Sequence, residues 1–173
     1  MTERQIEQMM QVKIEQWFDF VLFSPLWWLG VILSVVPWFL WFLFRNKQST
    51  DRLLYAGLFV MTVSLVFDVT GDQLGLWNYR YNVVPFLPTY LPWDLTLVPL
   101  AILLLLQVKP QANPYLKAIL FALLTSYVGE PIFTFLSIYD PVNWRLTFSV
   151  PIYFLIYLGA HFLTRRDSFR KLA

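Results

Sequence analysis

Residues 91–108 read LPWDLTLVPLAILLLLQV, an apolar run interrupted by a single carboxylate, Asp94. A helix needs about 20 apolar residues, within a range of about 17–25, to cross the hydrocarbon core of a bilayer. This stretch therefore predicts a membrane span. Asp94 follows Pro92 in the first turn of that helix, where a helix N-terminus favours negative charge. The question is whether Asp94 only caps the helix or also belongs to a functional site.

Four further stretches have the same apolar character. Of the 173 residues, 58% are hydrophobic and 14% are charged, whereas a soluble domain carries about 25% charged residues. Prolines inside the predicted spans favour kinked helices. We predict an all-α fold, a polytopic membrane helix bundle over residues 25–165, with five transmembrane helices at 27–44, 53–69, 91–108, 116–135 and 146–163.

The placement of Lys and Arg predicts the orientation of these spans, because cytoplasmic loops carry an excess of both residues. With five spans, the turns after the first and third spans lie on the same side as the C-terminal tail. These segments hold nine basic residues: Arg45, Lys47, Arg52, Lys109, Lys117, Arg165, Arg166, Arg170 and Lys171. The other side holds only Arg4, Lys13, Arg80 and Arg145. We expect the N-terminus outside the cell membrane and a basic cytoplasmic tail at 166–173.

The first 24 residues form a separate segment. Apolar residues recur there at helical spacing, with polar residues between them: Ile6, Met10, Ile14, Trp17 and Phe18. This pattern predicts an N-terminal amphipathic helix that lies at the outer membrane interface, and a partner-binding segment is the alternative. The segment lacks the basic head and early apolar core of a cleavable signal peptide.

Three acidic residues fall at one depth in this topology. Asp68 ends the second span, Asp94 begins the third, and Glu130 lies near the outer end of the fourth. At about 1.5 Å per residue, all three lie within roughly 8 Å of the outer boundary. Ionisable groups in a membrane usually face the bundle interior or a watery cavity. The common depth of the three acids therefore predicts one shared pocket. Alternatively, each caps a neighbouring helix, pairs with Arg80 or Arg145, or reaches interfacial water.

Aromatic residues are dense in the two outer connections beside these acids. An aromatic belt at the membrane interface accounts for many of them. The loop 71–90 is, however, rich in Pro and aromatic residues and nearly free of Lys and Ser. This composition predicts that the loop forms an ordered cap, which covers a pocket lined by acidic and aromatic residues. The candidate ligand-binding residues are Trp77, Tyr79, Arg80, Trp93, Asn143, Trp144 and Tyr153, and the candidate catalytic residues are Asp94, Glu130 and Asp68.

Composition disfavours several other kinds of site. The chain has no cysteine and one histidine, His161, which lies at the cytoplasmic end of the last predicted span. Thiol chemistry is excluded and a zinc site is disfavoured. We predict no metal site, although an oxygen-only Mg²⁺ or Ca²⁺ site built from the acids stays open. The net charge of +2 does not indicate nucleic-acid binding.

Four motifs carry a resemblance to a known family. They are FDVTGDQLGLWNY (67–79), PWDLTLVP (92–99), GEPIF (129–133) and YDPVNWRLTFSVPIY (139–153). Together they resemble a family of small five-helix bacterial integral membrane proteins that has no assigned biochemical function, over roughly residues 25–165. The resemblance implies a multi-pass protein of the cytoplasmic membrane. It points to Asp68, Trp77, Tyr79, Asp94, Glu130, Asn143, Trp144, Ser149 and Tyr153.

A second similarity is to lycopene-cyclase domains and related membrane terpene cyclases. DVTGDQLGLWNY (68–79) is similar to their first conserved stretch. Their second element is a proline with paired glutamates at the head of an apolar helix. PWDL (92–95) offers one acid at this place, and the chain is shorter than a complete cyclase. This similarity implies an isoprenoid ligand and acid catalysis.

Two functions of different classes remain open. The first is a non-catalytic component: a small-ligand or cation binder, or an accessory subunit in a homo- or hetero-oligomer of the membrane. The second is a lipid- or isoprenoid-modifying enzyme of the cyclase or isomerase kind, in which Asp94 donates a proton and Glu130 and Asp68 assist. A transporter is disfavoured, because five helices cannot form two equal inverted halves. No particular cofactor is indicated.

Overall fold

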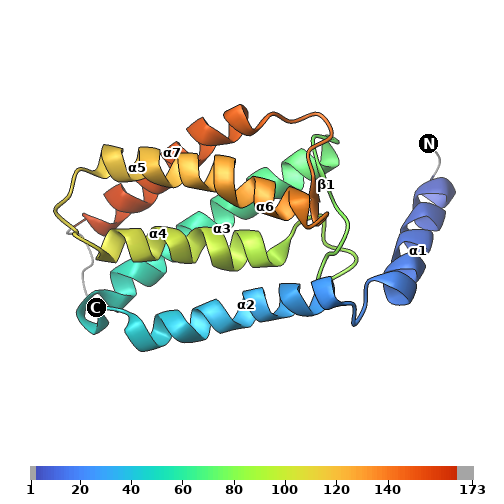
Figure 1. Ribbon diagram of the computed structural model, residues 1–173, viewed down its shortest axis with the longest axis horizontal. Coiled ribbons are helices and arrows are strands. Elements are labelled where there is room, and N and C mark those ends of the chain that lie inside the picture. Colours follow the sequence, from blue (N-terminus) through green and yellow to red (C-terminus); the bar gives the residue numbers. More distant parts are fainter. Residues whose placement is uncertain (1–2, 167–173) are drawn as a thin grey trace.

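Five helical segments pack side by side in the structure, a computed structural model that describes residues 3–166 (Figure 1). Short connections join them, including a 3₁₀ turn at Lys47–Ser49. The helix α1 (Glu3–Phe20) precedes the bundle, and residues 167–173 of the predicted basic tail lie outside the described part. The segments are α2 (Pro25–Phe44), α3 (Thr50–Gln73), α4 (Val98–Gln107), α5 (Pro114–Leu124) with α6 (Glu130–Phe135), and α7 (Leu146–Thr164).

Four helical stretches are long and apolar enough to cross a membrane. They are Pro25–Phe44, Lys47–Gln73, Pro114–Phe135 and Leu146–Thr164, and they coincide with four of the predicted spans. The predicted span 91–108 contains a shorter apolar helix, Trp93–Gln107. The described chain is therefore an all-helical bundle with the helices of a multi-pass membrane protein.

The stretch around α4 is the most enclosed part of the bundle. Val98, Leu100, Ile102 and Leu103 are each at most 4% exposed, and α4 packs between α2, α3 and α7. The apolar side chains of this stretch therefore contact protein. By contrast, α2 exposes large apolar side chains such as Phe39 along its length.

Prolines shape the helices at two points. A π-helical turn, η2 (Trp93–Leu97), lies just before Pro99, and a second one, η3 (Thr125–Gly129), lies just before Pro131. Proline lacks an N–H and its ring clashes with the carbonyl four residues earlier, so the preceding turn widens. The Leu95 carbonyl opposite Pro99 instead accepts from Trp38 Nε1 at 2.9 Å. Asp94 lies inside η2, and Glu130 directly follows η3.

The two ends of the bundle differ in character. At the end that we call the basic end, Arg52 donates to the Thr164 carbonyl at 3.2 Å and Arg165 donates to the Pro110 carbonyl at 2.6 Å. These bonds join the first turn of α3, the turn after α4 and the end of α7. The three segments that the topology predicted to share one side therefore meet.

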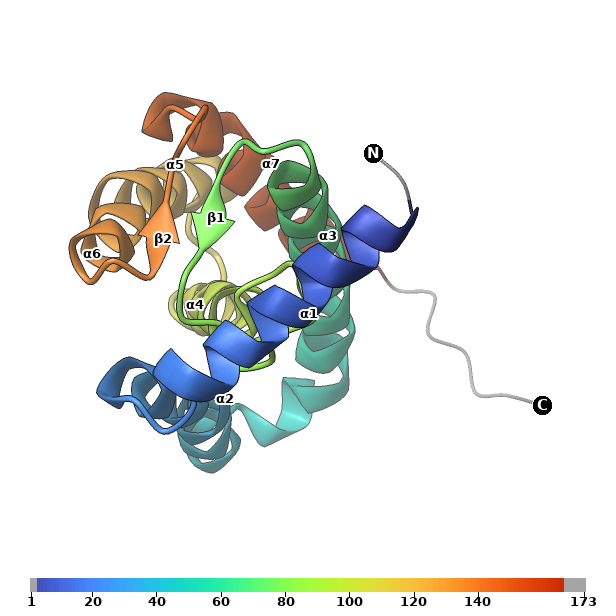
Figure 2. The same cartoon turned by 90° about the vertical axis from the view of Figure 1, so that its right-hand side faces the viewer.

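The opposite end, the capped end, is closed by two connections, residues 74–90 and 136–145, which we call the cap. Their strands β1 (Asn78–Tyr79) and β2 (Tyr139–Asp140) pair antiparallel. Figure 2 shows α1 crossing this end of the bundle. Trp17 of α1 donates through Nε1 to the Asn82 carbonyl at 2.7 Å, which ties α1 to the cap.

Candidate functional site

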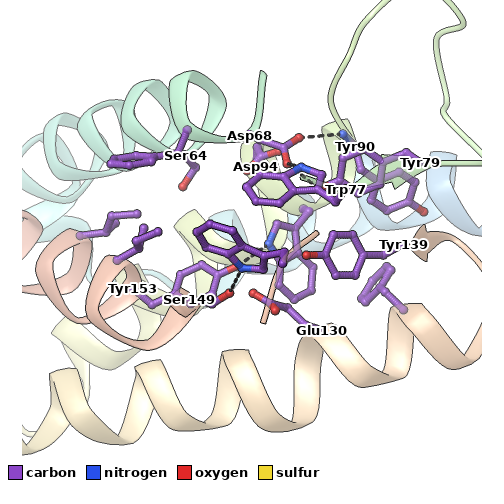
Figure 3. A pocket seen from close by; sticks show the side chains of 16 residues that line it. Ser64, Asp68, Trp77, Tyr79, Tyr90, Asp94, Glu130, Tyr139, Ser149 and Tyr153 are labelled. Atoms are coloured by element: carbon purple, nitrogen blue, oxygen red, sulfur yellow. Dashed lines mark hydrogen bonds between the residues drawn. The ribbon is translucent and has the colours of Figure 1, made fainter. Parts of the chain in front are cut away.

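A small cavity lies beneath the cap, between α3, η2, α6 and α7 (Figure 3). Its volume is about 70 Å³, enough for about two water molecules or one small head group. Asp68, Asp94 and Glu130 all line it. Figure 3 shows Asp68 and Asp94 close together, with Glu130 across the cavity from them. The three acids that share a predicted depth thus also share one cavity.

Most of the other predicted ligand-binding residues line the same space. They are Trp77, Tyr79, Trp93, Trp144 and Tyr153. Arg80 and Asn143 do not line it.

Arg80 and Asn143 fasten the cap instead. The backbone N–H of Arg80 donates to the Ile138 carbonyl at 3.1 Å, continuing the strand pair. Asn143 donates to residues 75 and 76, through its side chain at 3.1 Å and its backbone at 2.8 Å. Both residues therefore join the two connections of the cap above the cavity.

Asp68 holds the cap onto α3. Its Oδ1 accepts from Trp77 Nε1 at 3.0 Å and from the Tyr79 hydroxyl at 2.5 Å, and its Oδ2 accepts from the backbone N–H of Tyr90 at 3.3 Å. Trp77 reaches this position because Gly71 has no side chain. A Cβ atom on Gly71 would lie 1.9 Å from the indole ring. One buried carboxylate thus organises three points of the 74–90 connection.

Asp94 faces Asp68 and is 3% exposed. Its Oδ2 accepts from the Thr89 hydroxyl at 2.8 Å, and its carboxyl group lies within hydrogen-bonding reach of the Asp68 carboxyl. Two negative charges so close together would repel each other. Asp94 therefore does more than cap the N-terminus of its own helix.

Glu130 lies across the cavity and has a different environment. The hydroxyls of Ser149 and Tyr153 face its carboxylate. Each hydroxyl already accepts a bond from an indole: Trp144 Nε1 donates to Ser149 at 2.8 Å, and Trp93 Nε1 donates to Tyr153 at 3.0 Å. Each hydroxyl therefore has its own proton left to donate toward the Glu130 carboxylate. Glu130 is 6% exposed, and its Oε2 atom is buried without a hydrogen-bond partner.

The electrostatic character of the cavity follows from its lining. Among the described residues, no Lys, Arg or His lines it, and the donors to Asp68 and Asp94 are neutral groups. Burial raises the pKa of Tyr79, and the Asp68 and Asp94 carboxylates raise it further, so its hydroxyl stays protonated as a donor. Negative charge in the cavity must be balanced by protons or by a bound cation.

Several lining residues escaped the sequence-based prediction of the site. Ser64 lies one helical turn before Asp68 on α3, and its Oγ atom is buried without a partner. The spacing of four residues puts both side chains on one helix face, and this signal could have identified Ser64. Tyr90 and Tyr139 reach the cavity through the fold of the cap, and Tyr79 lies between them at ring separations of 5.8 and 5.7 Å.

The acids do not converge as metal ligands would. Within residues 3–166, no group of three His, Cys, Asp or Glu side chains is arranged to hold a metal ion. The cavity instead combines separated carboxyl groups with aromatic walls. Comparison of the chain with models of known protein families, with curated proteins and with solved structures finds no match.

Proposed function

We propose that this chain is a five-span protein of the cytoplasmic membrane, with its N-terminus outside, and that it binds a small organic cation, an ammonium group, beneath the cap. One observation carries the proposal: Glu130 is buried with an unpartnered carboxylate oxygen in a cavity that no described basic side chain lines. Removing an ionised carboxylate from water without an opposite charge beside it costs several kcal/mol. A cationic ligand removes that cost.

The lining suits an ammonium group in two ways. A primary ammonium donates up to three hydrogen bonds, and Glu130 Oε2 and Ser64 Oγ are both buried acceptors without a partner. Aromatic faces attract cations, by about 2 kcal/mol or more where water is excluded. Trp77, Trp93 and Trp144 supply such faces. The small volume of the cavity fits the charged head of a ligand.

The fifth span and the oligomeric state also belong to this proposal. The helix Trp93–Gln107 runs about 22 Å at 1.5 Å per residue, and its enclosure by α2, α3 and α7 supports a crossing that lipid hardly touches. If the chain acts as an accessory subunit in a homo- or hetero-oligomer, it would keep the same ammonium site.

Radiolabelled butylamine binding to the purified protein in lipid nanodiscs tests the ammonium site. We expect Glu130→Gln to weaken binding at least about tenfold, or about 1.4 kcal/mol, because a charge-assisted hydrogen bond contributes about 1.5–3 kcal/mol. Asp140→Asn is the matched control, since it removes one exposed carboxylate at the same end and should leave binding unchanged. Equal affinities of Glu130→Gln and wild type would contradict the proposal.

A second candidate function is acid catalysis on an isoprenoid, and the adjacent carboxyl groups of Asp68 and Asp94 favour it. Asp94 would transfer the proton shared by this pair to a carbon–carbon double bond. The aromatic walls would stabilise the resulting cation, and Glu130 would take up a proton as the new double bond forms. The product would be an isomer of the substrate.

Lipid extracts distinguish the catalytic candidate from simple binding. Membranes with wild-type protein are expected to contain an isomerised or cyclised isoprenoid that membranes with Asp94→Asn lack, because an amide cannot supply the proton. Mass spectrometry with chromatographic separation of isomers provides the measurement. Identical extracts from the two membranes would eliminate catalysis by Asp94 and leave ammonium binding intact.

A further inference from the structure

A groove runs along the surface where α3 and α7 pack against each other. It is lined by Tyr55, Leu58, Phe59, Thr62 and Val63 of α3, by Gly159, Phe162 and Leu163 of α7 and by Arg166, and its volume is about 650 Å³. The glycine lets the helices approach closely, because a Cβ atom there would lie 2.8 Å from the Phe59 ring. Between Tyr55 and Val63 the groove follows α3 for about 12 Å at 1.5 Å per residue. That length is close to the hydrocarbon depth of one leaflet, about 15 Å.

The groove and the cavity beneath the cap lie on the same seam. Ser64 of the cavity directly follows Val63 of the groove on α3, and Ile156 of the cavity lies about one turn before Gly159 on α7. Phe67 also lines the cavity while 49% of its surface is exposed on the apolar side of the bundle. The cavity therefore approaches the lipid-facing surface where the groove begins.

The cap closes the cavity from the opposite direction. Trp77 packs against Gly71 and meets Trp144 edge-on at a ring separation of 5.0 Å. Tyr79 stacks on Tyr90 at 5.8 Å. Asp68 bonds three points of this layer. A ligand that enters the cavity along the seam therefore displaces fewer hydrogen-bonded groups than one that enters through the cap.

We infer that the ligand is a single-chain amphiphile with a primary ammonium head, which enters from the bilayer along the α3–α7 seam. The inference rests on the proposed ammonium site and names the rest of the molecule. The head occupies the cavity beside Glu130, and the hydrocarbon chain lies in the groove from Val63 toward Leu58. Charge selects this occupant among membrane amphiphiles, because the carboxylates repel an anionic phosphate head group. An alkylamine remains protonated at pH 7, since its pKa is close to that of lysine, about 10.4.

Two probes of different chain length, dodecylamine and butylamine, test the groove separately from the head site. Thr62 is an exposed lining residue, so Thr62→Trp fills the groove without displacing core side chains. Val66→Trp is the matched control, because Val66 is 60% exposed on the same helix and lines neither space. Binding to protein in nanodiscs is measured with radiolabelled amines. Signal from nanodiscs without protein is subtracted as partition into lipid.

We expect Thr62→Trp to weaken dodecylamine binding about tenfold, equivalent to about 1.4 kcal/mol, and to leave butylamine binding unchanged. Val66→Trp should change neither. If butylamine binds but Thr62→Trp leaves dodecylamine binding unaltered, the groove does not hold the chain and the head site still stands. If Thr62→Trp weakens the binding of both amines equally, the groove likewise does not hold the chain. If wild-type protein binds neither amine specifically, the ammonium site itself fails.

Discussion

Replacing Asp68 by alanine is expected to lower the free energy of unfolding by about 3–5 kcal/mol. The substitution removes the acceptor of three hydrogen bonds, from Trp77, Tyr79 and the backbone of Tyr90. Each buried donor left without a partner costs about 1–3 kcal/mol. The cap should detach from α3, since this carboxylate joins the 74–90 connection to the helix.

Chemical denaturation in detergent micelles, followed by circular dichroism, measures the stability of this variant. Trypsin cleavage after Arg80 reports the opening of the cap. Asp72→Ala is the control, because Asp72 lies one turn further along α3 and, within the described part of the chain, its side chain accepts only from neighbouring Gln73, at 3.3 Å. Its effect should stay below about 1 kcal/mol. A stable Asp68→Ala variant with a protected cap would show that Asp68 does not organise the cap.

Replacing Lys117 by methionine is expected to destabilise the basic end by about 2 kcal/mol. Lys117 Nζ donates to the carbonyls of Leu105, Val108 and Lys109 at 2.8, 2.5 and 2.9 Å. The last carbonyls of a helix have no partner within it and carry partial negative charge. An ammonium group at the end of α4 satisfies them, whereas the thioether of methionine donates no hydrogen bond.

The same denaturation assay measures this loss, and Lys47→Met is the control because Lys47 is exposed at the same end. Butylamine binding should be unchanged in Lys117→Met, since residue 117 lies about 20 Å from residue 130 along its helical segment. Together with Asp68→Ala, this variant separates stabilising charges from the charge that binds ligand. A loss of butylamine binding by folded Lys117→Met would show that the two ends are coupled.

The acids have distinct roles even though they share a cavity. Asp68 is satisfied by the cap, and Asp94 is held by Thr89 and faces Asp68. Glu130 alone among the three has a buried oxygen without a partner. This difference in hydrogen bonding places the proposed ligand contact at Glu130, whereas the sequence first drew attention to Asp94.

The depth of the acids could be predicted from the sequence because a bilayer of fixed thickness sets the length of each span. Counting residues from the span ends then gives the position of a side chain along the membrane normal. The predicted boundaries of α2, α3, α5 with α6, and α7 are close to those observed. The prediction that the loop 71–90 forms an ordered cap agrees with the hydrogen bonds of Trp77, Tyr79 and Tyr90 to Asp68, although its first three residues, 71–73, belong to α3.

The failures concern residues whose place depends on contacts distant in sequence. Arg80 and Asn143 lie beside true lining residues in the chain, but the pairing of β1 with β2 and the bonds to residues 75 and 76 direct them into the cap. Tyr139 was not selected for the site, although its pairing with Tyr79 brings it to the cavity. Local patterns contain no information about which residue of one loop pairs with which residue of the other.

Hydropathy and charge placement alone predict a helical membrane bundle and the common level of Asp68, Asp94 and Glu130 within it. These properties depend on the transfer of each segment from water to lipid, which each segment undergoes largely independently. The tertiary structure adds that the three acids face one cavity, that Asp68 and Asp94 are neighbours, and that Glu130 stands apart. Those properties depend on the rotation of each helix about its axis. Rotation is set by packing between helices, such as that of α3 against α4 and α7, and hydropathy does not encode it.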